Sequence, residues 1–230
     1  MGIVPVPPTS QALIPERILS TAVSVLEGGL QRGCPSLHSG TMVDPFDRTR
    51  ARVRRLTTSE LGAVDVVAIR TLMVQAFGDD EDEAFRDEDW DHALGGTHIV
   101  VDIEGEIVAH ASVVERELHV DGRPLRTGYV EAVATAPDRQ GEGFGTLVMR
   151  EIGSVIKEGY ELGALGTGSH HFYQRLGWQT WRGPAFVREP GGDRRTPDEE
   201  GYILVLLTPS TPAIDLTTAI SCDWRPGDVW

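Results

Sequence analysis

The stretch from residue 129 to residue 158 constrains the fold more than any other part of the chain, because it predicts a strand, a glycine loop and a helix in immediate succession. β-favouring residues alternate with others as far as Thr135, and Pro137-Asp138 ends the strand as a turn. The glycines of the loop are Gly141, Gly143 and Gly145. The helix that follows has one apolar face, formed by Leu147, Val148, Ile152, Val155 and Ile156.

Glycines between a strand and a helix suit a phosphate group. Without a Cβ atom, the backbone can approach an anion closely and aim successive N–H groups at it. The helix adds the positive end of its dipole, and Arg139 adds a full positive charge. A plain strand-to-helix turn also uses glycine, so the loop alone leaves both interpretations open.

The spacing of the glycines separates the known phosphate loops. No Lys follows them, as a P-loop requires, and G-x-G-x-G is not the G-x-G-x-x-G of a dinucleotide site. Gln140-x-x-Gly143-x-Gly145 resembles the Q/R-x-x-G-x-G/A motif of the GCN5-related N-acetyltransferases (GNAT). The resemblance implies acetyl-CoA as cofactor, with coenzyme A as product. The cofactor contacts that it implies are Val133, Ala134, Thr135, Arg139, Gln140, Gly141, Glu142, Gly143, Phe144 and Gly145.

Four further segments narrow the resemblance. They are DWDHALGG (89–96), GYVEAVAT (128–135), YELGAL (160–165) and CDWRPGDVW (222–230), and they are similar to the aminoglycoside 2′-N-acetyltransferases of actinobacteria. The resemblance runs from about residue 50 to the last residue, so we expect an acetyltransferase domain at 50–230. Residues 1–49 form an extension of unknown role.

The pattern of elements predicts the order β-α-α-β-β-β-α-β-α-β-β. We expect this α/β (α+β) chain to form a mixed, largely antiparallel sheet flanked by helices, as in the GNAT fold. Glu104-Gly105 and Asp121-Gly122 predict tight hairpin turns. The expected strands are 50–56, 98–104, 107–120, 125–135, 160–165, 178–187 and 202–207, with a helix starting at 58 and a polar loop at 188–201.

Acetyl transfer to an amine needs a base for the ammonium and an acid for the departing thiolate. The resemblance implies that Glu131 is the base, directly or through water, and that Tyr173 is the acid. It also implies that the backbone of 133–135 pairs with pantetheine. Because Glu131 and Val133 are two residues apart, we expect both to point to one side of the strand. A surface-facing Glu and a core Tyr are the alternatives, with His170 and His171 as other acid or base candidates.

Charge and the same resemblance indicate a cationic substrate. The net charge of −14 argues against binding to nucleic acid or an anionic membrane. Nine acidic residues lie between Asp79 and Asp91, as a solvated loop or a cation-binding rim. Gly166 and Ala84 depart from the family, which usually has Ser and Asp there, and we expect Glu83 or another acid of this stretch to substitute for the Asp. The implied substrate contacts are Glu83, Asp89, Glu131, Ala132, Gly166, Asp198, Glu199, Asp228 and the terminal carboxylate of Trp230.

The C-terminal residues are either a frayed tail or a pinned one. Trp224, Val229 and Trp230 are apolar enough to hold the tail against the domain. The two cysteines, Cys34 and Cys222, indicate neither a metal site nor a disulfide framework. With no membrane span and no secretory signal in the sequence, we expect a cytoplasmic protein, and the resemblance implies a homodimer.

The leading hypothesis is acetyl-CoA-dependent N-acetylation of the 2′-amino group of an aminoglycoside antibiotic. One alternative is an acetyltransferase that acts on another polyamine or amine metabolite. The other, of a different class, is a non-catalytic protein that binds acetyl-CoA or the antibiotic. Release of free thiol in the presence of each acceptor separates the three.

Overall fold

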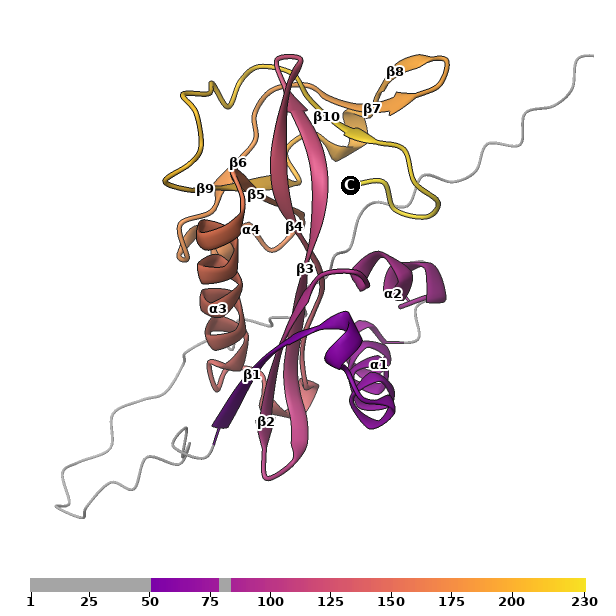
Figure 1. Cartoon of the computed structure of the whole chain (residues 1–230), viewed down its shortest axis with the longest axis vertical. Helices are drawn as coiled ribbons and strands as arrows, with labels where there is room; N and C mark the ends of the chain where they lie inside the picture. Colours follow the sequence, from indigo (N-terminus) through magenta and orange to yellow (C-terminus); the bar gives the residue numbers. More distant parts are fainter. Residues whose placement is uncertain (1–50, 79–83) are drawn as a thin grey trace, which may run out of the picture.

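The computed structural model describes residues 51–78 and 84–230, and in this part of the chain ten strands form a single sheet (Figure 1). The strands are β1 (Ala51–Thr57), β2 (Thr97–Ile103), β3 (Glu106–Val120), β4 (Arg123–Thr135), β5 (Leu162–Gly166), β6 (Gln179–Thr180), β7 (Ala185–Glu189), β8 (Gly192–Arg195), β9 (Ile203–Leu207) and β10 (Ile220–Asp223). The helices are α1 (Ala63–Phe77), α2 (Asp87–Ala93), α3 (Phe144–Gly159) and α4 (His170–Gln174).

The sheet is mixed and largely antiparallel, as predicted. Its order is β6-β9-β5-β4-β3-β10-β7-β8, and β2 and then β1 extend from β3. The long strand β3 pairs with two different strands along the same edge. Its residues 106–113 pair with β2, and its residues 119–120 pair with β10. Among the described strands, the parallel pairs are β4 with β5 and β10 with β7.

Both predicted hairpin turns are present. Glu104-Gly105 joins β2 to β3 with φ angles of 54° and 92°, and Asp121-Gly122 joins β3 to β4 with 50° and 73°. Two successive positive φ angles match the right-handed twist of the flanking strands. The long strands β3 and β4 are therefore held in register from a tight turn at one end.

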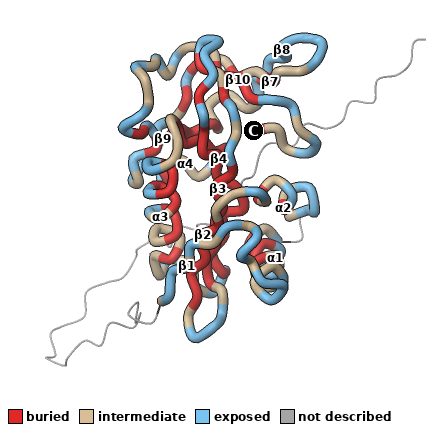
Figure 2. Tube along the Cα trace, in the orientation of Figure 1, coloured by how far each residue is buried: buried red, intermediate tan, exposed pale blue. Residues whose placement is uncertain are grey.

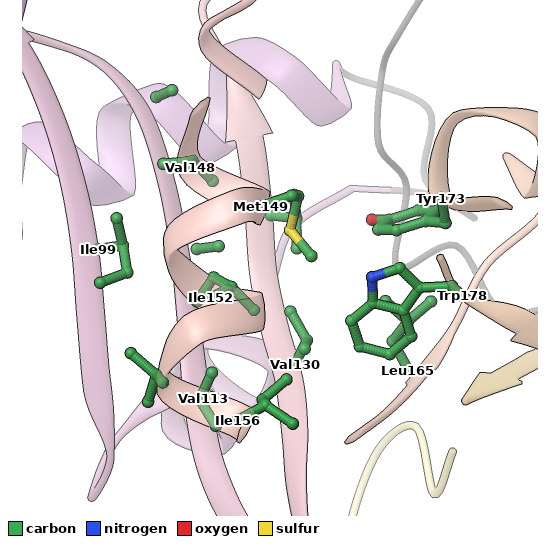
Figure 3. Packing of buried hydrophobic residues seen from close by; sticks show 14 of the residues in the cluster. Ile99, Val113, Val130, Val148, Met149, Ile152, Ile156, Leu165, Tyr173 and Trp178 are labelled. Carbon is green, nitrogen blue, oxygen red and sulfur yellow. The ribbon is translucent and has the colours of Figure 1, made fainter. Parts of the chain in front are cut away.

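Helix α3 covers one face of the sheet and buries the predicted apolar side chains. Val148, Ile152 and Ile156 are fully buried, together with Val113 and Val130 of the sheet (Figures 2 and 3). Burying such a side chain is worth about 1.5–3 kcal/mol relative to leaving it exposed. We call this cluster the α3 core; it fixes the helix against the strands that carry the glycine loop.

The opposite face of the sheet is covered by α1 and α2 (Figure 1). Ile69 and Met73 of α1 and Trp90 of α2 pack on the small residues Ala132 and Ala134 of β4. We call this cluster the α1–α2 core. Because β4 lies between the two cores, its side chains are sorted to one face or the other.

The C-terminal third differs from the expectation. The strand predicted at 178–187 is interrupted at residues 181–184, where an added Cβ on Gly183 would lie 1.8 Å from the carbonyl oxygen of Thr218. The predicted loop at 188–201 contains β8, and the tail contains β10. Strand β8 is wholly exposed and polar, so it carries no alternation that sequence analysis could detect.

The first helix also begins later than predicted. Residues Thr58–Glu60 form a separate 3₁₀ turn, in which the Glu60 carboxylate accepts a hydrogen bond from the Thr57 N–H. Helix α1 then starts at Ala63, with Gly62 as its N-cap. The Thr58-Ser59-Glu60 signal therefore marks a turn that precedes the helix and ends β1.

Candidate active site

Strands β4 and β5 separate in the middle of the sheet. They pair in parallel only at residues 127–129 and 162–164, although β4 continues to Thr135 and β5 to Gly166. On its other side, β4 keeps its pairing with β3 as far as Thr135. The backbone of 130–135 therefore presents one edge that is not paired with β5, and an extended molecule can form strand-like hydrogen bonds at such an edge.

The glycine loop follows the end of β4. Gly141 and Gly143 have φ angles of 81° and 90°, and Gly143 is the N-cap of α3. The first helical hydrogen bond runs from the Leu147 N–H to the Gly143 carbonyl. The N–H groups just before Leu147 therefore have no partner within the helix, and they lie at the positive end of its dipole.

Gly145 keeps the loop close to both neighbouring elements. An added Cβ would lie 3.1 Å from Thr135 Oγ1 and 3.6 Å from the ring of Phe172 in α4. The end of β4, the start of α3 and α4 thus meet at this glycine. The predicted cofactor residues 133–135 and 139–145 therefore lie together where β4 ends and α3 begins.

Two predicted cofactor residues play a different part from the one expected. Arg139 donates hydrogen bonds to both carboxylate oxygens of Glu142 at 2.9–3.0 Å, and this hydrogen bonding raises the pKa of Arg139. Its charge is therefore shared with Glu142. Phe144 is buried in the α3 core, so only its backbone can face a ligand, and Gln140 is half-buried beside the loop.

A β-bulge in β4 changes which residues share a face with the predicted base. Ala132 has a φ of 48°, and the pairing shifts from Ser112 opposite Glu131 to His110 opposite Ala134. The extra residue brings Val130 and Val133 to the same α3 core, although they are three residues apart. The expectation that Glu131 and Val133 share a face is therefore wrong, because a bulge interrupts the two-residue alternation of the strand.

Glu131 instead points to the side of α2 and the C-terminal tail. Its side chain is 8% exposed, and Oε1 lies 2.7 Å from Nη1 of Arg225. The two groups are close but poorly aligned, so among the described residues Oε1 has an ion-pair partner and no well-formed hydrogen bond. Burial lowers the pKa of Arg225, but the charge of Glu131 and the smaller effects of Tyr129 and Cys222 together more than offset burial, and the pKa lies above its ordinary value.

Helix α2 contributes a third titratable group to this site. His92 Nε2 donates to the carbonyl oxygen of Pro226 at 2.8 Å. Burial, and then the charge of Arg225, lower the pKa of His92, while Glu131 and Asp89 act in the opposite direction. Asp89 also accepts the Arg86 N–H at 2.8 Å at the start of α2. His92, Asp89, Glu131 and Arg225 are thus electrostatic neighbours.

The C-terminal tail is pinned and not frayed. Trp230 is fully buried, and its Nε1 donates to Thr196 Oγ1 at 3.1 Å. Arg225 Nε donates to the carbonyl oxygen of Asp228 at 2.7 Å. Trp224 is 55% exposed, so it does not hold the tail as predicted.

The remaining predicted substrate residues lie around this tail or outside the described chain. Thr196, the partner of Trp230, is the N-cap of a 3₁₀ turn that carries the exposed Asp198 and the half-buried Glu199. Gly166 is buried at the end of β5, and Ala132 is the bulge residue itself. Glu83 lies outside the described residues.

Tyr173 lies on the other side of β4, in the α3 core. Its ring packs edge-on against Trp178 at 6.0 Å, and its hydroxyl points toward Met149 (Figure 3). The side chain is fully buried, and within the described chain its hydroxyl has no hydrogen-bond partner. Burial raises the pKa of this hydroxyl, so Tyr173 stays protonated. A buried donor without a partner costs stability, and at a reaction centre such a group can serve a ligand.

The alternative acids give a mixed picture, and some site residues were missed. His170 Nε2 is also buried without a hydrogen-bond partner among the described residues, whereas His171 is exposed. Sequence analysis did not single out Arg225 or His92, although both lie in segments that it quoted, CDWRPGDVW and DWDHALGG. The resemblance of these two segments to the family was the signal that could have identified Arg225 and His92. The neighbouring residues in the sequence do not show that either side chain lies near Glu131.

Diverging central strands followed by a glycine loop at a helix N-terminus define an acyl-CoA-dependent N-acyltransferase architecture. The chain matches the Acetyltransferase (GNAT) domain family over residues 40–181, and it belongs to this family. GNAT enzymes bind acetyl-CoA as acetyl donor.

Individual relatives sharpen the comparison. The chain is 41% identical over 181 residues to an aminoglycoside 2′-N-acetyltransferase from Mycolicibacterium fortuitum, which covers 77% of this chain and 91% of the relative. The structure of the GNAT family N-acetyltransferase YhbS from Escherichia coli, solved with CoA, matches this structure with a TM-score of 0.53 and 18% sequence identity. The match covers 84% of this chain and 93% of YhbS. An acyl-CoA N-acyltransferase from Pseudomonas aeruginosa matches with a TM-score of 0.50 and 12% sequence identity. This match covers 68% of the present chain and 99% of the Pseudomonas protein. The two solved structures show the fold.

Two negative findings apply to residues 51–78 and 84–230. No helix there combines the length and apolar character needed to span a membrane. The same residues contain no group of three or more His, Cys, Asp or Glu side chains arranged to hold a metal ion.

Proposed function

We propose that this protein transfers the acetyl group of acetyl-CoA to the 2′-amino group of aminoglycoside antibiotics and so confers resistance. The observation that carries the proposal is the unpaired edge of β4 at 130–135, with the buried Glu131 carboxylate on one side and the buried Tyr173 hydroxyl on the other. The 41% identity to an enzyme of that name supports the choice of acceptor.

The residues present suit the cofactor. The edge of 130–135 offers backbone groups to an extended pantetheine arm, and the N–H groups of the loop and the start of α3 offer an anion site for its pyrophosphate. Glycines in the loop keep Cβ atoms away from that anion, and Gly145 has little room for one. Bound acetyl-CoA supplies the acetyl group as a thioester.

Glu131 takes the proton of the substrate ammonium, directly or through one water. Arg225 fixes the carboxylate by its charge, and Oε1 keeps acceptor capacity because its contact with Arg225 is poorly aligned. The freed amine forms a C–N bond to the acetyl carbon, the nitrogen releases its remaining extra proton to water, and the C–S bond breaks. Tyr173 donates its proton to the departing sulfur, because its hydroxyl is protonated and has no other partner within the described chain.

The substrate side of the site suits a molecule with several positive charges. Asp89, Glu131, Asp198, Glu199 and Asp228 come from α2, β4, the turn before β9 and the tail, and the terminal carboxylate of Trp230 adds another anion. An ion pair at 4 Å is worth about 1 kcal/mol in water and about 4 kcal/mol at an effective dielectric constant near 20. Several such contacts account for selective binding of a polycation.

The test is an assay of free thiol with acetyl-CoA and a panel of acceptors. Tobramycin and gentamicin, which carry a 2′-amine, should release coenzyme A. Kanamycin A and amikacin, which carry a 2′-hydroxyl, should not. Release with spermidine but with no aminoglycoside would replace the acceptor by another amine, and binding without thiol release would make the protein a non-catalytic binder. The homodimer and the cytoplasmic location stay predictions.

A further inference from the structure

A chain of hydrogen bonds, buried from His98 onward, runs from the segment before β2 to the bulge in β4. The Gly95 N–H donates to Thr58 Oγ1 at 2.8 Å, and Thr58 Oγ1 lies 2.9 Å from Nε2 of His98. His98 Nδ1 is 3.0 Å from Nε2 of His110, and His110 Nδ1 is 2.8 Å from the carbonyl oxygen of Ala132. Both imidazole rings are fully buried.

The chemistry of the last link sets the direction of the whole chain. A carbonyl oxygen only accepts, so His110 Nδ1 carries a proton and donates it to Ala132. In neutral His110, Nε2 is then an acceptor for the Nδ1–H of His98, and His98 Nε2 accepts from the Thr58 hydroxyl. Burial lowers the pKa of His98 to about 4 and that of His110 to about 3, which keeps both rings neutral. Each ring is therefore held in a single tautomer.

The end of the chain is the residue that breaks the β3–β4 ladder. Ala132 has a positive φ of 48°, which a non-glycine residue rarely adopts. At this position the regular pairing shifts, and the His110 side chain supplies a hydrogen bond to the carbonyl of the bulge residue. Glu131 directly precedes the bulge, lies on the face opposite Val130 and reaches Arg225, and the bulge returns Val133 to the α3 core.

We propose that the His98–His110 pair positions the catalytic base: it holds the Ala132 carbonyl and so fixes the backbone of the residue next to Glu131, which keeps Glu131 in place toward the acceptor amine. This inference rests on the proposed function. Neither ring touches the reacting atoms, so both are positioning residues. A proton relay does not fit, because the chain ends on a carbonyl oxygen and not on the Glu131 carboxylate.

A matched pair of variants at His110 separates positioning from simple packing. Asn and Leu have nearly the same shape, but Asn keeps an N–H donor near the place of Nδ1. Both leave space around Trp90 and both should lower the melting temperature. We expect His110→Leu to lower kcat at least tenfold, His110→Asn to stay within about threefold of the unchanged protein, and KM for acetyl-CoA to change less than twofold in both. Equal kcat losses in the two variants would overturn the proposal.

The same comparison at His98 keeps the test open if His110→Leu does not fold. His98→Asn retains a donor toward His110 Nε2, whereas His98→Leu leaves His110 free to change tautomer and place a lone pair against the Ala132 carbonyl. We expect His98→Leu to lose at least threefold more kcat than His98→Asn. Equal losses here would contradict the positioning role.

A measurement that does not depend on turnover separates this inference from the proposed function. Nitrogen-15 NMR of the imidazole rings in the unchanged protein reports each tautomer directly. Both His98 and His110 should be neutral with the proton on Nδ1 at pH 7. A proton on Nε2 of His110 would overturn the inference even if the enzyme is active, whereas failure of every aminoglycoside in the thiol assay would overturn only the proposed function.

Discussion

The two sides of β4 form two halves of the proposed site, and the two halves are built in different ways. The cofactor half consists of residues 133–135, the glycine loop, α3 and the helix of Tyr173, which follow one another along the chain. The substrate half joins Glu131 of β4, His92 of α2 and Arg225 of the tail, and the contact of His92 with Pro226 spans 134 positions. The residues proposed for the cofactor thus form a local motif, whereas those proposed for the acceptor come together through long-range contacts.

The halves also differ in how their polar groups are satisfied. In the cofactor half, the Tyr173 hydroxyl is buried with no hydrogen-bond partner among the described residues. In the substrate half, Arg225 pairs with Glu131, and His92 pairs with a tail carbonyl. Changes in the first half should therefore affect catalysis or cofactor binding with little loss of stability, whereas changes in the second half should affect folding as well.

The largest effect should come from Tyr173→Phe. General acid assistance is worth about 10²–10⁴-fold, so kcat should fall by that factor with little change in KM. Because the hydroxyl that is removed has no partner, the melting temperature should stay the same or rise slightly. Steady-state kinetics and thermal unfolding check both parts. A variant with unchanged kcat would make Tyr173 a core residue only.

Next in size is Arg225→Gln, which leaves the Glu131 carboxylate buried beside a neutral group. Breaking a buried ion pair costs about 3–5 kcal/mol, and we expect about 3 kcal/mol here because Arg225 keeps 15% exposure. Denaturant unfolding measures the change. The double variant Glu131→Gln/Arg225→Gln should recover most of it, since no unpaired charge remains.

An exposed ion pair provides the matched control for this prediction. The side chains of Arg55 and Glu158 are 50% and 62% exposed at a distance of 3.0 Å. Arg55→Gln should therefore change the free energy of unfolding by less than about 1 kcal/mol. If Arg55→Gln and Arg225→Gln lower the free energy of unfolding equally, the buried pair of the substrate half is no more important for stability than an exposed pair.

The buried histidine pair predicts a pH dependence of stability. Burial lowers the pKa of both rings, and the charge of His98 lowers that of His110 further, while the hydrogen bond to Ala132 acts in the opposite direction. The unfolded chain binds protons below about pH 6.5 and the folded chain does so only near pH 4 for His98 and pH 3 for His110. Stability is thus full above pH 6.5 and is lost as the pH falls toward 4, by on the order of 2 kcal/mol per ring at pH 5.

Unfolding midpoints measured from pH 7 to pH 5 check this prediction. His110→Leu should show a shallower decline than the unchanged protein, because one of the two titrating rings is gone. Replacement of the exposed His171 by Gln should leave the decline as it is. A decline that is the same in His110→Leu would show that other groups cause it.

The smallest effect expected is on cofactor affinity in Gly143→Asp. The position has a φ of 90° and lies at the N-cap of α3, so a carboxylate there opposes a bound phosphate and strains the loop. We expect at least a tenfold loss of acetyl-CoA affinity, about 1.4 kcal/mol, measured by calorimetry. Gly191→Asp, in the turn before β8 where an added Cβ meets nothing, is the control. Unchanged affinity in a folded Gly143→Asp protein would sink the assignment of the loop.

Local patterns were sufficient to predict much of the cofactor half. The alternation up to Thr135, the loop glycines and the apolar face of α3 are all set by neighbours a few residues away, and the two hairpin turns follow from Glu104-Gly105 and Asp121-Gly122. The sheet class was predicted from the order of the elements and the GNAT family from the resemblance of the loop motif, and both are confirmed. The roles of the individual site residues stay predictions.

Tertiary structure decided the substrate half. One extra residue at Ala132 reverses the face of every later side chain in β4. No residue type in YVEAVAT predicts this bulge. The hydrogen bond that His110 donates to the Ala132 carbonyl comes from another strand. Arg225 pairs with Glu131, although the two residues are far apart in the sequence. Nothing in the segment around either residue indicates that the two charges meet. Strand β10 forms because β3 and β7 accept it between them, which its own four residues do not encode. Periodicity and turn chemistry are local properties, and they appear in the sequence, whereas a bulge, a buried ion pair and an inserted strand depend on which distant segments meet.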